Sequence, residues 1–336
     1  MTEELVNILK RYDEIVAIVL DQKIDEYAEL LNQKPEGTDD ATYEEYIQRV
    51  AKDEADKLTE QFEEEEDEKL GGKSLHQIFD EMTLEQKEEA LEYCALELDR
   101  EVPKSLIKSM ASDENRDQVR NYCATVLGDS AWTEEELGED KIFEIEFQKV
   151  KAVLKVLIEM GEPCYTQAVL DRFMSYNQTR DFVADTIADY IEAFPEVTVP
   201  LLIQIIEDNE DTGLEGPCED CVIMLTAIGK EYKSEDIYDA LRHAFRYMTN
   251  KIYAVLCLAD YGDPRAASMF KNYINRNQNN IDRELFYEMM SAIQNLGGDI
   301  SDIHDPFGDF TKKMQQGKTQ QPEGKKLRPA GYNGNK

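Results

Sequence analysis

The sequence contains few residues of the kinds on which recognisable catalytic and metal sites depend. Only three of its 336 residues are histidine, at positions 76, 243 and 304, and this spacing does not suggest a metal cluster. The patterns of a phosphate-binding loop, of a dinucleotide-binding turn and of a hydrolase nucleophile turn are also missing from the sequence. We therefore expect the protein to have no cofactor, no metal and no catalytic residue, and not to be an enzyme.

Long apolar runs are missing too. Residues 1–4, MTEE, include no basic side chain, and the cleanest apolar run near them extends only from Ile15 to Leu20. A spanning helix needs about 20 apolar residues, and an export signal needs a basic start. Six cysteines in a chain without such a signal favour reduced thiols packed in the core over a disulfide framework. These features predict a cytoplasmic protein that does not enter a membrane.

Basic residues are scarce: 37 Lys and Arg stand against 72 Asp and Glu, which gives a formal net charge of −35. Nucleic-acid binding depends on basic residues that neutralise phosphates, so this composition argues against DNA or RNA as the partner. Residues 1–70 contain 8 basic and 23 acidic residues, whereas residues 312–336 contain 7 basic and 1 acidic. We expect a protein or peptide partner, and a basic one is favoured. Nucleic-acid binding through the basic tail is the alternative that this distribution leaves open.

The first 72 residues show the pattern of an acidic helical hairpin. Residues 34–37, KPEG, separate two helices, and the second runs from about Ala41 into the acidic run Glu63 to Glu68, which we interpret as a solvated helix end. In the second helix the apolar stripe passes through Tyr43, Ile47, Val50, Leu58 and Phe62. In the first helix it passes through Leu5, Ile8, Leu9, Tyr12, Ile15, Val16, Val19, Leu20, Ile24, Tyr27 and Leu31.

Shorter helices follow, first irregularly and then with a period. Three helices are expected at 83–98, 103–110 and 113–127, before a polar insertion that holds Trp132. From residue 142 onward, first helices are expected near residues 142, 179, 217, 250 and 281, and second helices at 163–176, 197–208, 234–248 and 263–276. A repeat of 31 to 38 residues that contains two helices is typical of a solenoid, in which neighbouring pairs cover one another's apolar faces.

The junctions between these helices carry matching start and stop signals. Asp263-Pro264 places a capping acceptor before a proline at a helix start, and Pro163 and Pro217 are expected to begin helices in the same way. Gly161 and Gly262 follow the preceding helices, where a left-handed residue ends a helix.

Residues 259–267, ADYGDPRAA, resemble the turn within a HEAT repeat, in particular the short type of phycobilisome-lyase-like proteins in the armadillo-type class. The resemblance covers about residues 142–297 and, loosely, 103–127. It implies an all-α, α-α superhelix, a HEAT-like solenoid with the N-terminal helical hairpin in front of it. The expected organisation is a hairpin at 1–72, an irregular helical region at 73–141, the solenoid at 142–300 and a disordered basic tail at 301–336.

One pair of residues suggests chemistry. Cys218 and Cys221 form a Cys-x-x-Cys pair at a helix start, which can lower a thiol pKa for redox exchange or supply half of a zinc site. On the helical interpretation both cysteines continue a buried stripe through Val222, Leu225 and Ile228, which favours packing. A redox or other enzyme that uses this pair is the alternative function.

The expected function is a non-catalytic scaffold that binds a protein or peptide on its concave face. Second helices of HEAT-like repeats usually line that face, so their positions outside the apolar stripe are the candidate binding residues. Four basic residues satisfy this condition and would form a cationic ridge able to hold a carboxylate: Arg172, Arg242, Arg246 and Lys271. The competing interpretation is that they are solvated residues paired with local acids such as Asp239.

Overall fold

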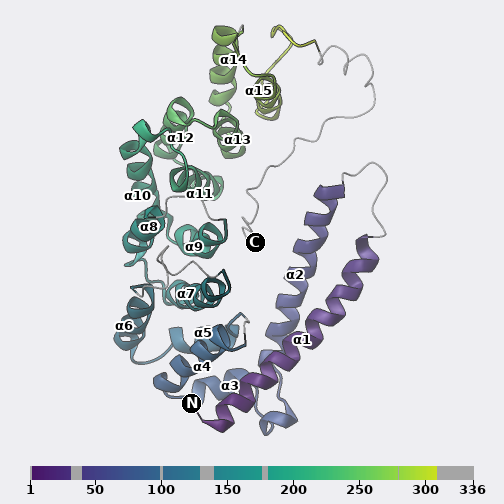
Figure 1. Cartoon of the computed structure of the whole chain (residues 1–336), viewed down its shortest axis with the longest axis vertical. Coiled ribbons are helices and arrows are strands. Elements are labelled where there is room, and N and C mark those ends of the chain that lie inside the picture. Colours follow the sequence, from purple (N-terminus) through teal and green to yellow (C-terminus); the bar gives the residue numbers. More distant parts are fainter. Residues whose placement is uncertain are drawn as a thin grey trace. The chain divides into compact units, whose positions relative to one another are not determined.

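The computed structural model describes residues 2–31, 40–98, 101–128, 140–175, 181–278 and 280–308, and within these ranges the chain forms helices and no β-strand (Figure 1). The expected all-α class is therefore confirmed. The chain divides into two compact units, Met1–Glu162 and Pro163–Lys336. The expected divisions after residues 72, 141 and 300 rest on sequence patterns and stay predictions. The Trp132 insertion and the tail from Lys312 lie outside the described residues.

The first unit contains one long helical hairpin and a group of shorter helices. Among the shorter helices, α3 was not expected from the sequence, whereas α4, α5 and α6 match the three helices expected there. The elements are α1 (Glu3–Leu31), α2 (Asp40–Glu64), the short 3-10 helix η1 (Glu68–Leu70), α3 (Leu75–Glu81), α4 (Leu84–Leu96), α5 (Lys104–Ala111), α6 (Arg116–Leu127) and α7 (Asp140–Met160).

Helices α1 and α2 pair along their length, as expected for a helical hairpin. Leu5, Leu9, Ile15 and Val19 are buried, so most of the apolar stripe of α1 does face protein. The expectation was wrong for Leu20 and for Phe62, which the same stripes included and which are exposed. A helix turns 100° per residue, so the wide stripe of a long helix extends past the narrow seam that one partner helix covers.

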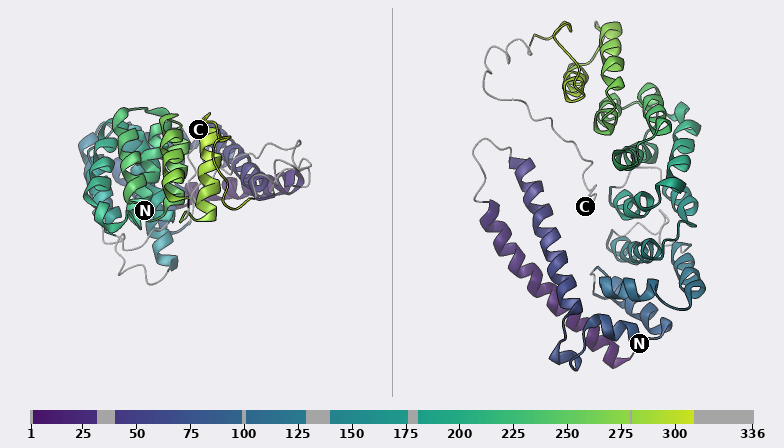
Figure 2. Two further views of the ribbon diagram at one scale, coloured as in Figure 1. Left: turned by 90° about the horizontal axis from the view of Figure 1, so that it is seen from above. Right: turned by 180° about the vertical axis from the view of Figure 1, so that it is seen from behind.

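The second unit stacks its helices in two layers (Figures 1 and 2). Helices α8, α10 and α12 follow one another in one layer, and α9, α11, α13 and α15 in the other. The helices begin within a few residues of the expected positions. The elements are α8 (Thr166–Met174), α9 (Asp181–Ala193), α10 (Pro195–Asp208), the 3-10 helix η3 (Glu210–Thr212), α11 (Pro217–Glu231), α12 (Glu235–Tyr247), α13 (Lys251–Tyr261), α14 (Arg265–Asn277) and α15 (Arg283–Asn295).

Most of the expected start and stop signals are confirmed. Pro217 is the first residue of α11, and Gly262 ends α13 with φ 82°, a conformation that a residue with a Cβ adopts only with strain. Asp263 accepts a hydrogen bond from the amide N of Arg265 at 2.9 Å, as a capping acceptor does. The expectation for Pro163 was wrong, because α8 begins at Thr166, three residues later.

Candidate binding surfaces

The four basic residues singled out from the sequence come from three helices of the second unit. Arg172 lies on α8, Arg242 and Arg246 lie on α12, and Lys271 lies on α14. Helix α10 contacts both α8 and α12 and therefore separates Arg172 from the two arginines of α12. Only Arg242 and Arg246, one turn apart on α12, are neighbours along one helix.

Local acids neutralise Arg242 and Lys271. A guanidinium nitrogen of Arg242 lies 3.0 Å from a carboxylate oxygen of Asp239, and the ammonium nitrogen of Lys271 lies 2.9 Å from Asp302. Arg246 is exposed and forms no ion pair with any residue in the described part of the chain. The pairing of Arg242 with Asp239 is the arrangement that the competing interpretation expected. As a group the four residues are therefore less cationic than their spacing in the sequence suggested.

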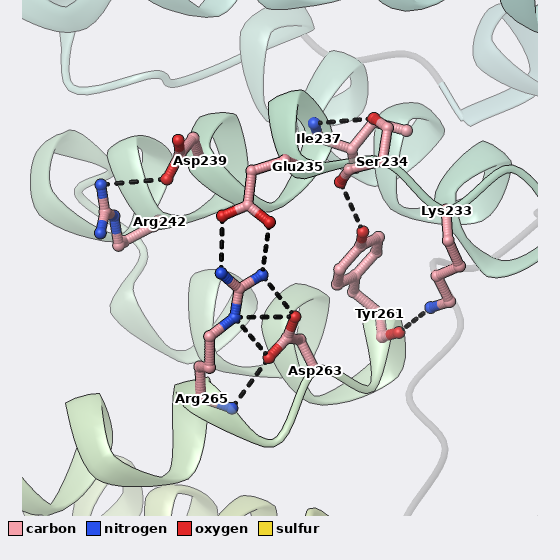
Figure 3. Close-up of polar contacts among 9 residues, drawn as sticks. All are labelled: Lys233, Ser234, Glu235, Ile237, Asp239, Arg242, Tyr261, Asp263 and Arg265. Atoms are coloured by element: carbon pink, nitrogen blue, oxygen red, sulfur yellow. Dashed lines mark hydrogen bonds and ion pairs between the residues drawn. The ribbon is translucent and has the colours of Figure 1, made fainter.

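A denser polar cluster joins the start of α12 to the turn between α13 and α14 (Figure 3). The guanidinium of Arg265 donates two parallel hydrogen bonds to Glu235, at 2.6 and 2.9 Å, and a further one to Asp263 at 2.7 Å. It also lies 3.8 Å from the centre of the Tyr238 ring. Hydrogen bonds from Arg265 are the largest cause that lowers the pKa of both Glu235 and Asp263. Two carboxylates and one ring thus occupy this guanidinium, so we assign it to packing between helix pairs.

The second half of the same cluster is held by Tyr261, the last residue of α13. Its hydroxyl donates a hydrogen bond to the carbonyl oxygen of Ser234 at 2.8 Å, and its own carbonyl accepts one from the ammonium of Lys233 (Figure 3). That ammonium also lies 3.9 Å from the centre of the Tyr261 ring. Residues 259–267 therefore connect the turn between α13 and α14 to the start of α12, a role that this segment did not reveal when read alone.

The Cys-x-x-Cys pair is buried. Cys218 and Cys221 are 5% and 0% exposed, and the sulfur of Cys221 lies 3.7 Å from the sulfur of Met174 on α8. Burial raises the pKa of both thiols, whereas nucleophilic or redox chemistry requires a lowered one. The expectation that all six cysteines pack in the core was wrong for Cys164, which is exposed. Among the described residues no group of three or more His, Cys, Asp or Glu side chains is placed to hold a metal ion.

The acidic run that begins in the last turn of α2 contains a side chain whose role the sequence did not reveal. Glu63 is only 3% exposed, and its carboxylate accepts hydrogen bonds from the amide N of Ser105 at 2.6 Å and of Lys104 at 3.2 Å. These amides are at the first turn of α5, where backbone N–H groups lack partners within the helix. The interpretation of this run as a solvated end was therefore wrong for Glu63, which caps another helix.

The α1–α2 pair is anchored at one end, and we call it the arm. At its base, Arg11 lies 2.7 Å from Asp67, and the hydroxyl of Tyr12 donates to the carbonyl oxygen of Glu101 at 3.0 Å. Towards the other end the contacts run between the two helices themselves. Lys23 of α1 pairs with Glu54 of α2 at 2.8 Å, and the Tyr43 hydroxyl donates to the carbonyl oxygen of Leu30 at 3.0 Å.

The arm combines strong negative charge with exposed apolar side chains. Its two helices contain 17 acidic and 6 basic residues, which gives a net charge of −11. Nine large apolar side chains are exposed among the described residues, and four of them belong to the arm: Ile18, Leu20, Tyr46 and Phe62. Tyr46 is the most exposed of the nine, at 51%, and Ile18 follows at 49%. Isolated exposed apolar residues are ordinary, but their concentration on one hairpin suggests a contact surface.

No family model, curated protein or solved structure matches this chain. The HEAT-like resemblance therefore rests on the residues and the helix spacing alone. None of the described helices combines the length and the apolar content that crossing a bilayer requires.

Proposed function

We propose that this protein is a non-catalytic, HEAT-like helical scaffold whose arm binds a basic, apolar segment of another protein. The observation that carries the proposal is the composition of the arm, whose two helices have a net charge of −11 and contribute four of the nine large apolar side chains that are exposed among the described residues. Neither property alone would indicate a ligand. Together they match a segment that presents Lys or Arg beside apolar side chains.

Two helices are the fewest that can bury an apolar seam, and they leave the flanks of that seam in water. Docking a third amphipathic segment covers such flanks, which is one of the recurring ways in which helices recognise peptides. Covering a side chain that is half exposed contributes about 1 kcal/mol, from about 1.5–3 kcal/mol for complete burial. The negative charge would add mainly to the association rate and to the choice of partner.

The second unit supports the scaffold part of the proposal. Its helix pairs stack in two layers, and clusters such as that of Arg265 connect one pair to the next. A framework built in this way can present a binding surface to a partner. The Cys-x-x-Cys pair also supports a non-catalytic role, because Cys218 and Cys221 are buried and burial raises the pKa of both thiols.

The exposed face of α12 is a second candidate contact, for an acidic peptide. Arg246 is exposed, and the pair between Arg242 and Asp239 joins two partly exposed side chains, a kind of pair that contributes only about 0.2–1 kcal/mol. Arg242 can therefore exchange Asp239 for a carboxylate of a ligand, whereas Arg265 is held by two acids. Charge reversal of Arg242 and Arg246, with Lys108→Glu on α5 as the matched control, tests this contact with a fluorescent acidic peptide.

The arm proposal is tested by fluorescence anisotropy with three labelled peptides of equal length. The first alternates Lys with Leu at helical spacing, the second has the same charge with Ser in place of Leu, and the third has Glu in place of Lys. We expect the first to bind most tightly and its affinity to fall as salt is raised, because counter-charges are screened beyond about 8 Å at 0.15 M salt.

Three single variants of the arm, Ile18→Ser, Leu20→Ser and Tyr46→Ser, locate the contact. We expect at least one of them to weaken binding of the Lys/Leu peptide about fivefold to tenfold, the equivalent of about 1–1.4 kcal/mol. Val197→Ser and Tyr232→Ser remove exposed apolar side chains from the second unit and serve as controls. The proposal fails if the controls weaken binding as much as the arm variants, or if the Lys/Ser peptide binds as tightly as the Lys/Leu peptide.

A further inference from the structure

We propose that the basic segment 309–336 of the same chain docks on the arm and competes with the partner for it. This inference rests on the proposed function of the arm and names its regulation. The segment follows Gly308, the last described residue, and contains 7 basic residues against Asp309 and Glu323, a net charge of +5. It is the one long stretch of the chain with a positive balance, and it belongs to a chain of net charge −35.

The segment also has the apolar side chains that the arm requires. Residues 325–328 read KKLR, so that Leu327 is flanked by basic side chains, and Tyr332 follows nearby. On the arm, Ile18 and Tyr46 are each about half exposed, on two helices that together have a net charge of −11. The guanidinium of Arg49 lies 5.8 Å from the centre of the Tyr46 ring. The segment therefore complements the arm in two ways: its charge is opposite, and both surfaces offer apolar side chains.

The arm is a better partner for this segment than the second unit is. Residues 163–308 contain 25 acidic and 11 basic residues, a net charge of −14 over 146 residues, whereas the arm reaches −11 in 54. Acids are paired in both regions, Glu235 and Asp263 with Arg265 in the second unit and Glu54 with Lys23 on the arm, so the comparison rests on the charge per residue. A second copy of the arm is not expected to bind there, because two arms that each have a net charge of −11 repel each other.

The tether sets the expected size of the competition. A chain of 28 residues extends to at most about 100 Å, and a ligand on a short flexible tether has an effective concentration of about 1 mM. If the free segment bound the arm with a Kd of about 100 µM, the tethered segment would raise the apparent Kd of a competing peptide about tenfold.

The experiment compares three proteins: the full chain, a chain that ends at Gly308, and a chain in which residues 309–336 are replaced by a Gly/Ser sequence of equal length. Truncation after Gly308 keeps Phe307, whose ring packs 5.7 Å from that of Phe286 on α15, so the second unit retains its described contacts. The labelled Lys/Leu peptide is the competitor, and a labelled peptide of sequence 309–336 is the direct ligand.

We expect the Lys/Leu peptide to bind the truncated and the Gly/Ser chains about tenfold more tightly than the full chain. We also expect the 309–336 peptide to bind the truncated chain, more weakly at high salt, and to bind it less well when Ile18 or Tyr46 is replaced by Ser. Equal affinities for the full and truncated chains would overturn the inference and leave the function of the arm standing. Failure of the Lys/Leu peptide to bind any of the three would overturn the proposed function itself. Binding of the 309–336 peptide that the arm variants do not affect would also overturn the inference.

Discussion

Replacing Glu63 with Ala should destabilise the first unit by about 2–4 kcal/mol. The carboxylate is the acceptor for the amide N–H groups of Ser105 and Lys104 at the start of α5, at 2.6 and 3.2 Å. A buried donor left without an acceptor costs about 1–3 kcal/mol, and the loss of a helix cap typically costs about 1 kcal/mol. The Ser105 donor is buried and the Lys104 donor is partly buried, so the two do not contribute equally.

Glu63→Gln provides the matched control, since the amide oxygen still accepts one of the two hydrogen bonds without a buried charge. Burial is the largest influence on the pKa of Glu63 and raises it, and the hydrogen bonds from Ser105 and Lys104 lower it only in part. A raised pKa means that the ionised carboxyl is less favourable in the folded chain than in the unfolded one. Wild type should therefore gain stability relative to Glu63→Gln as the pH falls from about 7 through the raised pKa towards 4.5, the ordinary value for Glu.

The measurement is urea unfolding of wild type and both variants, with hydrogen exchange of the α5 amides to assign the transition to the first unit. The expected order of stability at pH 7 places Glu63→Ala clearly below Glu63→Gln, and the Ser105 amide should lose its protection in the Ala variant. An Ala variant within 0.5 kcal/mol of wild type, a change no larger than that of an ordinary surface substitution, would refute the capping role. A difference between wild type and Glu63→Gln that does not change with pH would refute the assignment of the raised pKa.

Three further outcomes follow from the packing. In the native protein only the thiol of Cys164 should react rapidly with a disulfide reagent, whereas all six thiols should react after unfolding. Fast reaction of a second thiol would contradict the burial of the other five. Gly229→Ala should destabilise the folded protein by about 1–3 kcal/mol in thermal unfolding, because the added Cβ would lie 2.8 Å from the Tyr261 ring. Ala usually favours a helix over Gly, so a stabilised variant would refute this packing. Asp113→Ala should lower stability by about 3–5 kcal/mol in urea unfolding, because the buried ammonium of Lys87 loses its carboxylate partner at 2.9 Å. A loss below about 1 kcal/mol would show that water reaches the ammonium.

Local patterns predicted the helices well because the information needed to place a helix lies within about one turn of each residue. The helix period predicted a first helix near residue 179, and α9 begins at Asp181. Pro217 and Gly262 predicted one helix start and one helix end, since each acts on its own backbone conformation. The same reasoning was wrong for Pro163, where an irregular turn of three residues precedes the helix.

The candidate surfaces were harder to predict, because exposure depends on which neighbours a side chain meets. Leu20 and Phe62 belong to apolar stripes that a single partner helix does not fully cover, so both remain in water. Arg242 is predicted correctly as a residue outside the buried stripe, but its neutralisation by Asp239 depends on the rotamers of both side chains. A stripe therefore shows which side chains are able to be buried and not which ones are.

The sequence by itself determined the all-helical class, the places where most helices begin and end, the excess of acid and its concentration in the first 70 residues. Each of these follows from composition or from interactions between residues a few positions apart. Only the tertiary structure decided that Glu63 caps α5, which begins 41 positions later, and that Arg265 is held by Glu235, 30 positions earlier. It also decided that four of the nine exposed large apolar side chains of the described residues belong to the acidic arm. These contacts depend on how helices meet in space, and no local period in the sequence records that.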